Sequence, residues 1–61
     1  MKIFHIALAF DDGTIERVNI ECLDSHIAQT ITKGWFDYMK RAIWVTLKDG
    51  SDKFIIAYFN R

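Results

Sequence analysis

The chain has 61 residues, of which 51% are hydrophobic and 15% aromatic, and its eight basic residues are balanced by eight acidic ones. This length allows a single small domain, residues 1–61, and the balanced charge excludes long-range attraction to nucleic acid or to an anionic membrane. The one cysteine, Cys22, excludes an intramolecular disulfide, and no apolar run approaches the roughly 20 residues of a membrane span.

A β-hairpin is predicted at the start of the chain. Its first strand, residues 2–10, is apolar on both faces, as in a central strand that is covered on two sides. Asp12-Gly13 follows and indicates a type I′ turn, which needs a positive φ at both central residues. The partner strand, residues 14–22, alternates apolar with polar side chains, so we expect one wet face and a position at an edge of the sheet.

The middle of the chain is predicted to be helical. Asp24 or Ser25 is suited to cap a helix of about nine residues, and Gly34 to be the left-handed residue that follows it. Beyond Gly34 the pattern fits either a helix or an extended segment. We favour helical character over residues 35–40, with a kink or restart at Gly34.

The phase of this helix determines which side chains face the core. If the helix continues through Gly34, residues three and four apart form an inward apolar stripe: Ile27, Ile31, Trp35, Tyr38 and Ala42. Phe36 then lies on the outer face, with Lys33 and Lys40 one turn away on either side. A single crossing helix also makes the third strand parallel to the second, with the two Asp-Gly turns at opposite ends of the sheet. Two antiparallel helical segments would instead place both turns at the same end.

A second hairpin is predicted at the end of the chain. Ile43, Val45 and Leu47 alternate with other residues, Asp49-Gly50 repeats the turn signal, and residues 54–59 form a strand that is apolar on both faces. Two β-hairpins flanking a helical middle segment predict an α+β fold of ββαββ order, with a mainly antiparallel four-stranded sheet and the helix on one face. Two-sided apolarity places the first and fourth strands in the centre, so the second and third remain open to pairing with another copy.

Catalytic and metal sites are not indicated. Asp24, Ser25 and His26 include the residue types of a catalytic triad, but contiguous side chains at a helix start diverge, and capping explains the first two. Cys22, Asp24 and His26 provide too few converging zinc ligands, because the pattern does not place His5 beside them. We therefore expect a non-enzymatic protein without metal or cofactor.

The stretch KGWFDYMKR, residues 33–41, is the basis of the functional hypothesis. Its three aromatic residues and one methionine cannot all face one sheet, so at least one large aromatic is displaced outward. Aromatic side chains with basic neighbours are typical of protein-binding hot spots and of surfaces that stack nucleic-acid bases. The alternative is that the tryptophan and tyrosine form the core and that the basic residues are its solvated rim.

The candidate partner-binding residues are Trp35, Phe36, Tyr38, Lys40 and Arg41. The favoured function is a small inhibitory or regulatory module that binds a larger protein through this aromatic and basic patch. The alternatives are a nucleic-acid-binding protein that uses the same patch and a structural homo-oligomer of phage or mobile-element type. We also expect a homodimer, because of the apolar excess and the edge strands. The expected location is the cytoplasm of a bacterial or phage system, because the sequence indicates no signal peptide and no membrane contact.

Overall fold

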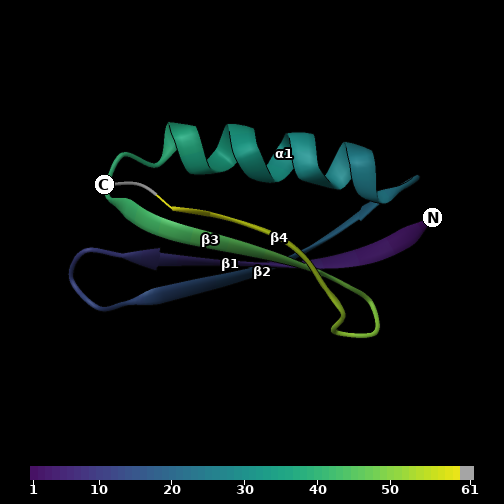
Figure 1. The fold of residues 1–61 in the computed structure, drawn as a ribbon, viewed down its shortest axis with the longest axis horizontal. Coiled ribbons are helices and arrows are strands. Elements are labelled where there is room, and N and C mark those ends of the chain that lie inside the picture. Colours follow the sequence, from purple (N-terminus) through teal and green to yellow (C-terminus); the bar gives the residue numbers. More distant parts are fainter. Residues whose placement is uncertain (60–61) are drawn as a thin grey trace.

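The computed structural model describes residues 1–59 and contains one antiparallel sheet with one helix on a single face (Figure 1). The elements in chain order are β1 (Lys2–Phe10), β2 (Ile15–Cys22), α1 (Ser25–Tyr38), β3 (Ala42–Asp49) and β4 (Phe54–Phe59). The predicted α+β fold, its ββαββ order and the position of the helix are confirmed. No helix within residues 1–59 has the length and apolar character needed to cross a membrane.

The strands lie in the order β2-β1-β3-β4, so β1 and β3 are central. The prediction that the fourth strand is central and the third is at an edge is wrong. β4 is apolar on both faces but has a neighbouring strand on one side only among the described residues. Because β1 pairs antiparallel with both β2 and β3, those two strands run parallel, and the two turns lie at opposite ends of the sheet, as expected for a single crossing helix (Figure 1).

The two hairpins have three-residue loops instead of the predicted two-residue type I′ turns. In the first, Phe10 N donates to Thr14 O at 2.9 Å, and the loop closes at Gly13, whose φ is 89°. In the second, Asp49 N donates to Lys53 O at 2.9 Å, and Asp52 has the positive φ, 63°. A turn followed by a left-handed residue is the usual three-residue hairpin. The structural counterpart of Gly13 is therefore Asp52, not Gly50.

Carboxylates at both turns have lowered pKa values, which predict a fold that is less stable in acid. Hydrogen bonds from the Thr14 hydroxyl and backbone lower the pKa of Asp12, and hydrogen bonds from the Lys53 and Ser51 backbone lower the pKa of Asp49. A lowered folded pKa contributes stability that is present above the unfolded value of about 3.9 and is lost as the pH falls through the folded value.

We therefore expect the free energy of unfolding to decrease below about pH 4, as measured by urea denaturation from about pH 2 to pH 7. Asp49→Asn should be less stable than wild type at neutral pH and should lose less stability on acidification, because its side chain carries no charge to protonate. An Asp49→Asn variant with the wild-type pH profile would show that the turn carboxylate does not contribute to the acid response.

Helix α1 begins at the Asp24 cap, where the carboxylate accepts a hydrogen bond from Ile27 N at 3.0 Å. The helix then continues through Gly34 to Tyr38 and ends at Met39, whose N–H donates to Trp35 O at 3.0 Å. The predicted break at Gly34 is wrong, whereas the helical character beyond it is confirmed as far as Tyr38. Core side chains lie on both sides of Gly34, and their packing holds the helix together there.

Replacing Gly34 with Ala is expected to stabilise the protein by up to about 1 kcal/mol, because glycine is a poor helix former. Gly34 has helical backbone angles, and a Cβ placed there meets nothing within 4 Å. Thermal unfolding should show a midpoint roughly 4–8 °C higher per kcal/mol gained. A lower midpoint would mean that the helix needs the freedom of glycine at this point.

The helix buries a stripe other than the predicted one. Its buried residues are Ala28, Thr32 and Phe36, four residues apart, whereas Ile27 and Ile31 are partly exposed. Thr32 is accommodated because its hydroxyl donates to Ala28 O at 2.8 Å, so no buried donor is left unpaired. The predicted inward stripe and the outward position of Phe36 are both wrong.

The core lies between α1 and the sheet. Apart from the helix residues, it contains side chains from β1, β2 and β3: Phe4, Ile6, Leu8, Cys22, Ala42, Val45 and Leu47. Partly buried aromatic and aliphatic residues, including Trp35 and Met39, pack against it. The opposite face of the sheet has no covering layer within the described residues.

Candidate protein-binding surface

The structure separates the five predicted contact residues. Phe36 is only 7% exposed and stacks on Tyr58 of β4 with ring centroids 6.5 Å apart, so it belongs to the core. Trp35 is half-buried against the core. Tyr38, Lys40 and Arg41 are exposed at the C-terminal end of the helix, and Tyr38 is 78% exposed.

The two flanks of the helix differ in chemistry. Lys33 Nζ lies 5.5 Å from the centroid of the Tyr58 ring, so the flank that carries Lys33 faces β4. Each helical residue advances by about 100°, which places Ile27, Ile31 and Tyr38 on the opposite flank, toward β2. Trp35 forms the inner border of this flank, next to the buried stripe. We refer to Ile27, Ile31, Trp35 and Tyr38 as the β2-side flank.

Edge strand β2 extends this apolar surface. Val18 pairs with Ile6 and Ile20 with Phe4, so both project from the helix-covered face of the sheet. Ile20 is partly buried and Val18 is exposed, so the helix does not enclose β2.

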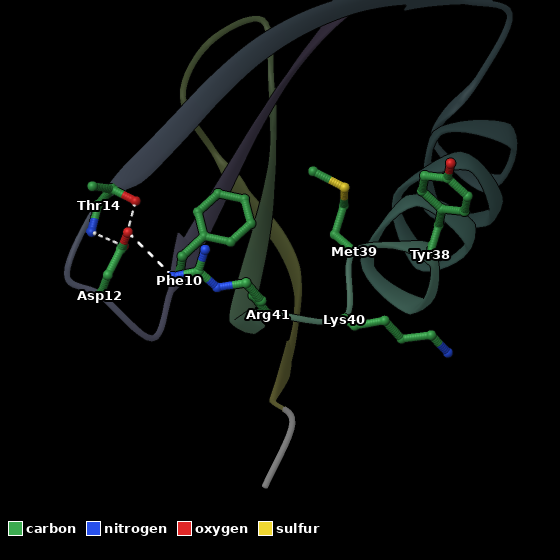
Figure 2. A pocket seen from close by; sticks show the side chains of 7 residues that line it. All are labelled: Phe10, Asp12, Thr14, Tyr38, Met39, Lys40 and Arg41. Carbon is green, nitrogen blue, oxygen red and sulfur yellow. Dashed lines mark hydrogen bonds and ion pairs between the residues drawn. The ribbon is translucent and has the colours of Figure 1, made fainter.

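A hollow of about 400 Å³ adjoins the C-terminal end of the flank (Figure 2). It lies between the β1–β2 turn and the segment that connects α1 to β3. The side chains that line it are Phe10, Asp12, Thr14, Tyr38, Met39, Lys40 and Arg41. Figure 2 shows Tyr38 and Met39 on one side and Phe10 on the other, with Lys40 pointing away from Phe10. Phe10 and Met39 also pack against the core, so they give the hollow a fixed apolar wall.

Most basic groups of this segment are paired within the chain. Arg41 Nη2 lies 3.0 Å from Asp11 Oδ1 and 3.4 Å from Asp12 Oδ2, and Asp11 N donates to Arg41 O at 3.2 Å. The hydrogen bond to Asp11 raises the pKa of Arg41, which stays fully charged. Lys33 pairs with Asp37 at 3.0 Å. Among the described residues, Lys40 is the cation of this segment that has no ion-pair partner.

The residues considered for chemistry do not converge. His5 projects from the helix-free face of the sheet, where its Nδ1 lies 2.7 Å from Asn19 Oδ1, whereas Cys22 lies on the helix side and its thiol donates to Asp24 O. Within residues 1–59 no group of three or more His, Cys, Asp or Glu side chains is placed to hold a metal ion.

The inward stripe predicted from the sequence contains all four residues of this flank, Ile27, Ile31, Trp35 and Tyr38, although Trp35 and Tyr38 are also among the candidate contact residues. The signal for the correct phase is a second stripe, made of Ala28, Thr32, Trp35, Phe36 and Met39, which contains three large side chains. Comparisons with protein families, with curated proteins and with solved structures find no match for this chain.

Proposed function

We propose that this protein is a small non-enzymatic interaction module that binds a larger protein through the β2-side flank and the adjoining hollow. The observation that carries the proposal is the position of Tyr38, a largely exposed aromatic that connects the apolar flank of the helix to the Phe10 and Met39 wall of the hollow. Contiguous apolar surface with an aromatic anchor is characteristic of protein-binding sites.

The charge around this surface favours a partner segment that is mainly apolar and carries an acidic group. The apolar part would cover Ile27, Ile31 and Tyr38, and the acidic group would face Lys40, which also lines the hollow. Polar contacts at the rim of an apolar centre are the usual arrangement in protein interfaces. A module of this size regulates or inhibits its partner by occupying a surface, and the buried free thiol of Cys22 supports a reducing, cytoplasmic location.

Nucleic-acid binding through the same segment has less support. Binding to phosphates depends on cations that are available to replace counterions. Lys33 and Arg41 already face carboxylates in this chain, which leaves Lys40 to attract a phosphate backbone.

The proposal is tested with a tagged protein used to capture partners from a lysate of the source organism, with nuclease and high-salt washes. Tyr38→Ala and Ile31→Ala are compared with wild type, and Thr30→Ala, an exposed residue of the same helix outside the β2-side flank, is the matched control. For the purified partner, Tyr38→Ala should weaken binding at least about 30-fold, the level of a hot-spot residue, and Thr30→Ala should have little effect.

Thermal melts of each variant must show that the fold is intact, since all three residues are exposed. Equal capture by wild type, Tyr38→Ala and Ile31→Ala would mean that the β2-side flank is not the contact. Loss of all captured material on nuclease treatment would favour nucleic acid instead.

A further inference from the structure

The two edge strands of the sheet differ in how they are protected from pairing with other strands. β2 carries Glu16, Arg17 and Glu21, whereas β4 has the sequence FIIAYF and no charged residue. Natural proteins usually place charges, proline or a covering segment at a sheet edge, because its backbone groups attract other strands. Within residues 1–59, β4 pairs with β3 alone and has no such charge.

The side chains of β4 are apolar on both faces of the sheet. Ile56 and Tyr58 pair with Leu47 and Val45 and lie on the helix side, where they pack against the core. On the helix-free side, the strand begins and ends with aromatic residues: Phe54 is 57% exposed and Phe59 77% exposed. A further strand placed against β4 would therefore bury apolar surface on both faces and also satisfy the backbone of the edge.

We propose that β4 pairs in antiparallel fashion with β4 of a second copy of this chain, which joins the two sheets into one sheet of eight strands. A strand that pairs antiparallel with itself forms an isologous contact about a two-fold axis, in which each residue makes the same contact twice. Because β4 is uncharged, no charge approaches its own copy in this arrangement. The same pairing through β2 would bring together several charged side chains and their copies.

A second copy also fits the limited core of the domain. A chain of this size gains roughly 3–5 kcal/mol from a single core, and small domains usually add disulfides, a metal or oligomerisation. The one cysteine is free, and no metal-binding group is present in the described part of the chain. Oligomerisation remains, and pairing at the apolar edge would bury exposed side chains such as Phe54 and Phe59.

This pairing goes beyond the proposed function, because it uses the opposite side of the molecule. The β2-side flank lies over the far edge of each sheet, so a dimer formed through β4 would present two copies of the flank, one at each outer end. Two linked sites increase the apparent affinity for a partner that itself has two binding sites.

The test uses charge reversal at Ala57, near the centre of β4 and half-buried on the helix-free side. Near the two-fold axis this residue lies close to its own copy, so Ala57→Lys and Ala57→Glu should each place like charges together. Light scattering across dilution should give twice the 7.2 kDa chain mass for wild type and the single mass for each variant alone. An equimolar mixture of the two variants should regain the double mass, because Lys then faces Glu.

Arg17→Glu, at the other edge of the sheet, is the matched control and should retain the double mass. The proposal would be overturned if wild type had the single mass at every concentration. It would also be overturned if Arg17→Glu dissociated the dimer while both Ala57 variants stayed dimeric. If the Ala57 variants do not fold, hydrogen exchange of wild type decides. The β4 amides should exchange more slowly at high than at low protein concentration, and equal rates would overturn the pairing.

Discussion

Phe36→Ala is expected to lower the free energy of unfolding by about 3–5 kcal/mol, the usual loss when a buried phenylalanine is truncated. Phe36 is almost fully buried, stacks on Tyr58, and fills the space between the C-terminal half of α1 and the sheet. A domain of this length has a total stability of roughly 3–9 kcal/mol. The substitution should therefore leave a large unfolded population, measurable by urea denaturation followed by circular dichroism.

Tyr38→Ala is the control, because it removes an aromatic side chain from the same helix but from an exposed position. It should change the stability by no more than about 0.5 kcal/mol. If Phe36→Ala instead melts within a few degrees of wild type, Phe36 is not part of the core, and the outer position that the sequence indicated for it would be correct.

The sequence correctly indicated that one aromatic of residues 33–41 is displaced outward, but it did not identify which one. The answer depends on a rotation of about 100°, the angle between neighbouring helical residues. Hydrophobicity favours a stripe that contains Ile27 and Ile31, whereas the structure buries Ala28 and Thr32. The small side chains are tolerated because Phe36, together with the half-buried Trp35 and Met39, supplies the larger apolar contribution.

The strand order could not be read from apolar faces alone. A central strand and an apolar edge strand have the same two-sided pattern, and the distinction depends on which strands lie beside them. The two-sided apolarity of residues 54–59 predicts a central fourth strand and leaves β3 at an edge, yet β3 lies between β1 and β4. The hairpins and the crossing helix were predictable because their signals are local: turn residues, alternation and the Asp24 cap.

The candidate contact residues were partly separated by long-range pairing. Lys40 and Tyr38 are both exposed, although the predicted inward stripe included Tyr38. Arg41 forms an ion pair with Asp11, 30 residues earlier in the chain. The pairing of β1 with β3 places Phe10 beside Ala42. Because Asp11 follows Phe10 and Arg41 precedes Ala42, the β1–β2 turn then lies next to Arg41. No local pattern contains this contact, because it follows from the strand order.

Leu47→Ala is expected to cost about 2–5 kcal/mol, the range for truncation of a buried leucine. Leu47 is fully buried in β3 and pairs with Ile6 of β1 on one side and Ile56 of β4 on the other. Ile56 lies in the same row and on the same face of the sheet, but on the edge strand, where it is only partly buried. Ile56→Ala should therefore cost distinctly less, as measured by urea denaturation of both variants under dilute conditions.

Dilution matters for this comparison, because self-pairing through β4 would add to the burial of Ile56. At low protein concentration Leu47→Ala should lose more unfolding free energy than Ile56→Ala. At high concentration the difference between the two losses should narrow, because dimer formation makes the stability depend on concentration. A larger loss for Ile56→Ala in the dilute monomer would mean that β4, not β3, lies inside the sheet. A gap that does not change with concentration would mean that no second copy pairs with β4.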